Sequence, residues 1–321
     1  MDWLFEVWLT KPLWMWLVFL GLVLTLLVLD LTVLHRKQHA VSMKESLLTT
    51  AGYCSLALLF GGWVWWEMGT TKALEYYTGY VVEFSLAMDN VFVIAMILGF
   101  FKIPAQYQHR VLFWGILGVI VLRGIMIGVG AALVAEFHWV LYLFAGFLVI
   151  SGVKMLLLAD HESDLGNNPL LKFLRKHGRV TEKLHGKKFW VRLKDSNTGH
   201  YAWYMTPLMV ALILVEVADV VFAVDSVPAI FAITTDPYIV YTSNIFAILG
   251  LRALYFTLAG LIERFKYLKY ALAILLIFIG SKIFVADLLG LEKIPPSIGL
   301  SVTFAILASG VIYSLIKTKK A

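Results

Sequence analysis

The sequence predicts an all-α polytopic membrane protein with about nine transmembrane helices. Three observations lead to this class. The 321 residues are 60% apolar and only 15% charged, whereas soluble domains are about half apolar and a quarter charged. The apolar residues gather in nine runs of about 20, the length that crosses a bilayer as a helix. The basic residues gather in the segments between these runs, as they do in cytoplasmic loops of membrane proteins.

The nine spans also predict an orientation. Under this count, the segments rich in Lys and Arg all fall on one side of the membrane, and the longest is 159–203 with nine basic residues. The positive-inside rule then places the N-terminus outside and the C-terminus in the cytoplasm. The expected spans are 12–34, 47–66, 79–101, 111–134, 139–158, 204–232, 242–262, 268–288 and 298–316.

Several classes of function are excluded or disfavoured. The net charge of +6 does not indicate nucleic-acid binding, because the basic residues lie beside apolar spans, as orientation signals do. Cys54 is the single cysteine, so no disulfide within the chain, CxxC pair or thiolate metal cluster can form. No P-loop, HExxH or GxSxG pattern is present. The sequence therefore predicts neither an enzyme nor a bound cofactor.

An acidic pattern occurs twice within otherwise apolar spans. The first copy carries Glu83 and Asp89. The second carries Asp219 and Asp225, again six residues apart, and the two copies align without a gap. Glu216 is an additional carboxylate of the second copy. Such self-similarity indicates an internal duplication.

Basic residues extend this duplication. Arg123 and Lys154 follow the first copy 31 residues apart, and Arg252 and Lys282 follow the second copy 30 residues apart. Each repeat holds three spans, and an odd number forces the two copies into opposite orientations, as in many secondary transporters. The predicted parts are two N-terminal helices in 1–78, repeat 1 in 79–158, a basic cytoplasmic loop in 159–203, repeat 2 in 204–290, and a last helix with a basic tail in 291–321.

Five carboxylates inside the membrane call for an explanation. An ionised side chain at the centre of a span costs about 2.5–3.5 kcal/mol on insertion scales, and such residues usually line a cavity and mark an ion path. The alternative is mutual neutralisation, since four basic residues of the repeats are available as partners. Both interpretations hold together if the basic residues form ion pairs with the carboxylates while no cation is bound, and release them when a cation arrives. The four expected partners are Arg123, Arg252, Lys154 and Lys282.

The donor chemistry favours a hard divalent cation. The eight histidines lie in loops or at span edges, so carboxylate and neutral oxygens remain as ligands, which suits Mn²⁺, Mg²⁺ or Ca²⁺ better than zinc or copper. Residues six apart on an unbroken helix point about 120° away from each other, and Pro228 is a candidate kink that would change this geometry. Glu216 and Asp219 share a helix face. Candidate neutral donors, each with helix–helix hydrogen bonding as the alternative, are Asn90, Ser226, Thr234, Thr235 and Asn244.

The segment 159–203 is the one sizeable hydrophilic part of the chain. Its stretch LLKFLRKHGRVTEKLHGKKFW has the composition of a basic amphipathic helix on the cytoplasmic leaflet. A charged connector that fixes the topology is the simpler interpretation.

The motifs EFSLAMDNVFV, EVADVVFAVDSVPAIFAI and NIFAILGLRALYF resemble those of the TerC family of bacterial and plastid membrane proteins, over roughly 79–290. The resemblance implies a place in the lysine-exporter superfamily and manganese efflux as the activity, in a bacterial inner membrane. The family is also associated with tellurite resistance and a redox role. The family's acidic motif residues correspond to Glu83, Asp89, Glu216, Asp219 and Asp225.

These observations leave three hypotheses. The first is a secondary transporter that exports Mn²⁺ as its substrate, with possible coupling to protons. The second is an oxyanion handler in which Arg123 and Arg252 are the ligands. The third is a membrane protein of redox modulation or metal delivery without transport of its own. The lipid bilayer is the expected surrounding and nucleic acid is not an expected partner; the oligomeric state is not predicted. For the first hypothesis, Asp89 and Asp225 are expected at the centre of one divalent site.

Overall fold

We describe a computed structural model of the chain, which defines residues 2–30, 42–137, 139–157, 169–194, 200–258, 267–291 and 294–319. Helices dominate it, and the remaining elements are a 3₁₀ helix at Asp2–Phe5 and two small antiparallel hairpins. The strands are β1 (Val7–Trp8), β2 (Lys11–Pro12), β3 (Trp190–Lys194) and β4 (Tyr201–Met205). The helices are α1 (Leu13–Leu29), α2 (Met43–Met68), α3 (Thr70–Phe100), α4 (Ala105–Glu136), α5 (Val140–Leu157), α6 (Pro169–His177), α7 (Pro207–Phe231), α8 (Pro237–Leu258), α9 (Leu268–Leu288) and α10 (Pro296–Lys319).

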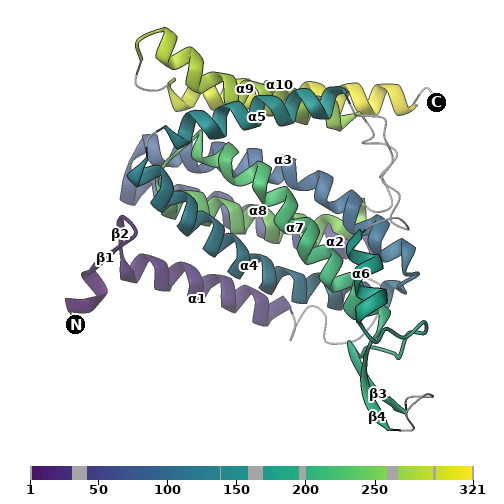
Figure 1. Cartoon of the computed structure of the whole chain (residues 1–321). Helices are drawn as coiled ribbons and strands as arrows, with labels where there is room; N and C mark the ends of the chain where they lie inside the picture. Colours follow the sequence, from purple (N-terminus) through teal and green to yellow (C-terminus); the bar gives the residue numbers. More distant parts are fainter. Residues whose placement is uncertain are drawn as a thin grey trace.

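The helices confirm the all-α polytopic class. Among the described residues, eight helices are long and apolar enough to cross a membrane, namely α2 to α5 and α7 to α10. The predicted first span appears as α1, an apolar helix of 17 described residues, which is shorter than these eight helices. The chain begins at one end of the helical bundle and α10 ends at the other (Figure 1). Opposite ends agree with an odd number of crossings.

The bundle has two layers (Figure 1). One layer contains α5, α9 and α10, and α5 packs along α9 more extensively than any other pair of helices. The other layer contains α1 to α4, α7 and α8. Almost every residue of α8 is buried, because α2, α3 and α4 all pack around it. The layers meet where α3 and α7 face α5 and α9, and that interface carries the candidate site.

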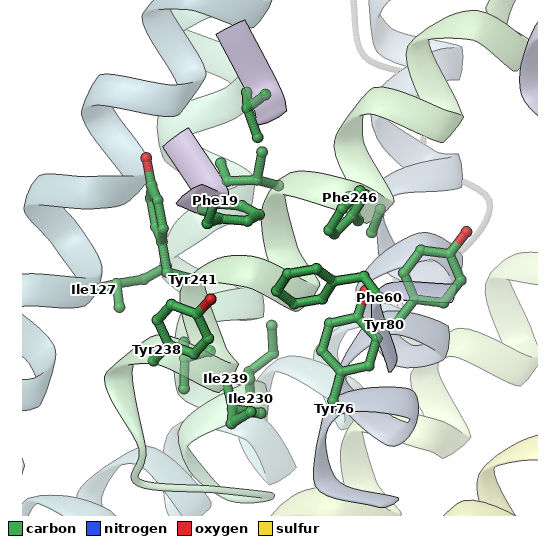
Figure 2. Close-up of a cluster of buried hydrophobic side chains, with 14 of the residues drawn as sticks. Phe19, Phe60, Tyr76, Tyr80, Ile127, Ile230, Tyr238, Ile239, Tyr241 and Phe246 are labelled. Atoms are coloured by element: carbon green, nitrogen blue, oxygen red, sulfur yellow. The ribbon is translucent and has the colours of Figure 1, made fainter. Parts of the chain in front are cut away.

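An aromatic cluster fixes the first two helices to the second repeat (Figure 2). Phe19 of α1 is fully buried and its ring lies 5.7 Å from the rings of both Phe60 of α2 and Phe246 of α8. Tyr238 and Tyr241 of α8 complete its surroundings. Buried aromatic rings contribute large contact areas with preferred edge geometry, so α1 and α2 form part of the same folded core as α8.

Two glycines allow α5 and α9 to approach closely. A Cβ atom on Gly152 would lie 2.7 Å from the carbonyl oxygen of Ala273, and one on Gly280 would lie 2.6 Å from that of Ala145. The two glycines occupy the same place in the predicted repeats, because Gly152 lies two residues before Lys154 and Gly280 lies two residues before Lys282. The two contacts are also reciprocal, since Ala273 precedes Gly280 by seven residues and Ala145 precedes Gly152 by seven residues. Such contacts are what a two-fold relation between the helices would produce. The inverted repeat of the whole halves stays a prediction.

The structure corrects the expectation for the basic loop. The predicted amphipathic helix is confirmed only over Pro169–His177 (α6), where Leu171 is buried against the core. The chain then turns and forms the β3–β4 hairpin, in which alternate residues face solvent, and the helix of the predicted span 204–232 begins only at Pro207. Alternation of large and polar residues with a period of two favours a strand over a helix. Within the predicted loop, residues 159–168 and 195–199 lie outside the described part of the structure.

Candidate functional site

A cavity of about 760 Å³ lies between α3, α4, α5 and α7, with Leu276 of α9 at its edge. Its wall combines apolar residues with hydroxyl, amide and charged groups. Six of the residues predicted for the site line it: Glu83, Asn90, Arg123, Lys154, Asp225 and Ser226. The structure therefore brings together residues that are separated by up to 142 positions in the chain. Charged and polar groups at this depth of a membrane protein normally mark a functional path.

Arg123 and Glu83 form a buried ion pair at this cavity. The distance from Arg123 Nη2 to Glu83 Oε1 is 2.8 Å, and the two side chains are 2% and 1% exposed. Arg123 Nη1 also donates hydrogen bonds to Ser226 Oγ, at 2.7 Å, and to Asn244 Oδ1. Asn244 Nδ2 in turn donates to Glu83 Oε2 at 3.3 Å. This network connects both predicted repeats, because α3 and α4 supply the ion pair and α7 and α8 supply the neutral groups.

The equivalent pair of the second repeat is Asp219 with Arg252. Arg252 Nη2 donates to Asp219 Oδ2, and its Nη1 donates to the carbonyl oxygen of Leu112 at 2.8 Å. A Cβ atom on Gly115 would collide with Arg252 Nη1, so a larger residue at this position of α4 would displace the guanidinium. Glu83 aligns with Asp219 and Arg123 with Arg252, which means that both halves use the same acid–arginine pair.

Asp225 is held differently from these paired acids. Ser151 Oγ on α5 donates a hydrogen bond of 2.9 Å to Asp225 Oδ1, and Lys154 lines the same cavity one turn further along α5. Asp89 lies on α3, although its side chain is outside the described part of the structure. Asn90 borders both the large cavity and a small one beside Asp219, and its buried Oδ1 atom has no hydrogen-bond partner among the described residues. An unsatisfied buried acceptor is costly, and a bound cation would satisfy it.

Glu216 and Lys282 lie outside the large cavity and belong to neither acid–arginine pair. The carboxylate of Glu216 faces α4, where a Cβ atom on Gly118 would collide with it, and its buried Oε2 atom has no hydrogen-bond partner within the described part of the chain. Lys282 lines a separate cavity near the ends of α3 and α9. Within the described side chains, no group of three His, Cys, Asp or Glu residues comes together as a metal centre. The single divalent site centred on Asp89 and Asp225 therefore stays a prediction.

The helices that carry the acids are continuous. α3 runs unbroken from Thr70 to Phe100, and α7 runs unbroken through Pro228 to Phe231. Pro228 lies in the last turn of α7, so the missing amide hydrogen falls close to the helix end and produces no break between Asp219 and Asp225. Both acids of a repeat therefore keep the separation of about 120° that an unbroken helix imposes. Asp219 faces α8 and Asp225 faces α5.

Sequence analysis missed two residues that the structure places at these cavities. Ser151 is a neutral residue in an apolar run and lies outside the acidic motifs, so nothing in its surroundings singled it out. Glu75 lies eight residues before Glu83 and has no acidic counterpart in the second repeat, where Ala211 occupies the aligned position. Its signal in the sequence is a second carboxylate eight residues before Glu83 on the same helix, even though the second repeat has no counterpart to it.

The fold and the site define a polytopic helical membrane protein with buried charges at helix interfaces. The chain belongs to the integral membrane protein TerC family, whose model matches residues 68–321. It is 46% identical to an uncharacterised membrane protein of Myxococcus xanthus, over 96% of this chain and 93% of that protein. It is 48% identical to an uncharacterised membrane protein of Rickettsia bellii, over 94% and 97%. It is 47% identical to Alx of Escherichia coli K12, named as a candidate membrane-bound redox modulator, over 91% of each chain. No solved structure matches.

Proposed function

We propose that this protein is a secondary transporter that exports Mn²⁺ from the cytoplasm. One observation carries the proposal: buried acid–arginine pairs occur at equivalent positions of the two repeats, and one of them, Glu83 with Arg123, lines a cavity that also holds Asp225. In this arrangement Arg123 neutralises Glu83 while no cation is bound. A cation that enters the cavity would compete with the guanidinium for the carboxylate oxygens. The buried pairs therefore provide an uncharged empty state and a charged ligand set within the same side chains.

The oxygen donors support a hard cation as the substrate. Carboxylate, amide and hydroxyl oxygens of Glu83, Asp225, Asn90 and Ser151 line the cavity, and such ligands suit Mn²⁺, Mg²⁺ or Ca²⁺. The preference for Mn²⁺ comes from the membership of the TerC family and not from the geometry. Coupling to protons is part of the proposal, because protons and a metal ion compete for the same carboxylate oxygens.

For export, the protein would lie in a bacterial inner membrane with its C-terminus in the cytoplasm. The support is the distribution of Lys and Arg, which favours the end of the bundle where α10 stops. A phosphatase that is active only in the periplasm, fused after Ala321, is expected to remain inactive. The same enzyme fused before the first helix is expected to be active. Strong activity of the C-terminal fusion would contradict this orientation.

The direct test is the manganese content of cells with and without the protein under manganese load. Expression is expected to lower intracellular Mn²⁺ and to restore growth in medium where the deletion strain is inhibited. In proteoliposomes that contain only the purified protein, a proton gradient across the membrane should drive Mn²⁺ in the direction opposite to the flow of protons. Equal manganese content in both strains, together with no flux in proteoliposomes, would refute transport.

The names of the relatives favour a second candidate, redox modulation. Cys54 is the only cysteine in the sequence, and its Sγ atom accepts a hydrogen bond from the Tyr80 hydroxyl at 3.3 Å. One thiol provides no dithiol chemistry within the chain, so this candidate would act through another protein. A change in cellular redox balance with unchanged manganese content would favour it over transport.

A further inference from the structure

A second cavity of about 320 Å³ lies further along the same helices than the first. It is bounded by the beginning of α3, the beginning of α5, the end of α7, the end of α9 and the beginning of α10. This is the end of the bundle where the described chain begins (Figure 1). Its polar wall consists of Thr71, Glu75, Thr78, Thr235, Lys282 and Asp287.

Glu75 is the buried acid of this cavity. It is 5% exposed, and its Oε2 atom accepts hydrogen bonds from Lys72 Nζ, at 2.7 Å, and from Thr234 Oγ1. Lys72 also lies 3.8 Å from Asp236 Oδ2, which accepts a further ion pair of 3.2 Å from Lys11. Glu75 therefore repeats the arrangement of the first cavity, in which a basic residue neutralises a carboxylate on α3.

The two cavities follow each other along four helices. On α3, Glu75 and Thr78 line the smaller cavity and Glu83 lines the larger one, and Val82 between them is fully buried. The two carboxylates are eight residues apart, or about 12 Å along an unbroken helix. A buried apolar residue separates the two linings on the other helices as well. Together with Val82 these residues form the apolar layer: Ala145 of α5, Ala229 of α7 and Ile279 of α9, each at most 2% exposed.

We propose that the smaller cavity is the outward half of the transport route and that Glu75 is the carboxylate that receives the divalent cation there. This inference rests on the proposed function. The apolar layer is the closed barrier in the state described here, because a cation cannot cross buried apolar side chains without ligands. Lys72 and Lys282 replace the cation as partners of the acids once it has left.

The first test is Glu75→Gln, which keeps the side-chain volume and removes the charge. Mn²⁺ efflux from cells and proteoliposomes is expected to fall about tenfold or more, the loss expected when a charged ligand is removed. Binding of Mn²⁺ to the purified protein is expected to persist, since the larger cavity is intact, and it shows that the variant is folded. Glu67→Gln, at an exposed acid of the same end of the bundle, is the matched control and should transport normally.

The outcomes separate this inference from the proposed function. If the unmodified protein moves no Mn²⁺, the proposed function fails and the role of Glu75 fails with it. If the unmodified protein exports Mn²⁺ and Glu75→Gln exports it at the full rate, only the outward cavity is refuted.

The second test probes the apolar layer directly. A Cys54→Ser chain contains no cysteine, so Thr235→Cys reports on the smaller cavity and Leu86→Cys on the larger one. A membrane-impermeant thiol reagent outside intact cells is expected to label the first and not the second. Adding Mn²⁺ should increase labelling of Leu86→Cys, because transport opens the layer. Labelling of Leu86→Cys from outside without Mn²⁺, or of Thr235→Cys only from the cytoplasmic side, would overturn the proposal.

Discussion

Replacing Asp225 by asparagine is expected to abolish protection against manganese. Asn keeps the volume and the hydrogen bond with Ser151, but it removes the charge that would hold a cation. Loss of a charged ligand should lower the efflux rate by about tenfold to a hundredfold. Asp89→Asn should have a comparable effect, because the two acids align in the repeats. Growth under manganese load and Mn²⁺ flux in proteoliposomes are the measurements.

The control for this experiment is Glu136→Gln, at an exposed acid beyond the cavities, which should leave efflux unchanged. Protein in the membrane fraction must be equal in all strains. Lower pH should reduce Mn²⁺ binding by the unmodified protein, since protonated carboxylates do not bind a cation. If both Asn variants still protect cells at normal expression, the acids are structural partners of the basic residues and the transport site lies elsewhere.

Arg123→Met is expected to destabilise the protein strongly. The substitution leaves the carboxylate of Glu83 buried, 1% exposed, without its cationic partner. Breaking a buried ion pair from one side costs about 3–5 kcal/mol, so the thermal midpoint in detergent should fall clearly. The double variant Glu83→Gln with Arg123→Met should recover most of this stability, because no unpaired charge remains. It should not recover Mn²⁺ efflux.

Arg123→Lys separates a counter-ion from a substrate ligand. Lysine retains the charge but loses the planar fork that reaches Glu83, Ser226 and Asn244 together. Partial Mn²⁺ transport is therefore expected if Arg123 neutralises the empty site. Loss of oxyanion handling, with divalent cation levels unchanged, would instead identify the arginine as an anion ligand. Full transport by Arg123→Met would exclude any role for the residue in the site.

Much of the site could be predicted because charge is rare inside apolar spans. Glu83, Arg123 and Asp225 each stood out against their neighbours, and all three line one cavity. Lys282 stood out for the same reason, but it lines the second cavity. On α9, Leu276 borders the first cavity, and Lys282 lies six residues further toward the end of the helix. Sequence spacing gives no distance between side chains on different helices.

The sequence by itself determined the membrane class, the positions of the helices and the identity of the buried charges. Segregation of apolar from charged residues is a property of the chain, and a bilayer imposes it on every span. Only the tertiary structure decided which charges meet. Arg123 pairs with Glu83 and Arg252 pairs with Asp219, where Gly115 of α4 leaves room for the Arg252 guanidinium, and Ser151 of α5 donates a hydrogen bond to Asp225. Such choices depend on packing between helices, which no local pattern records.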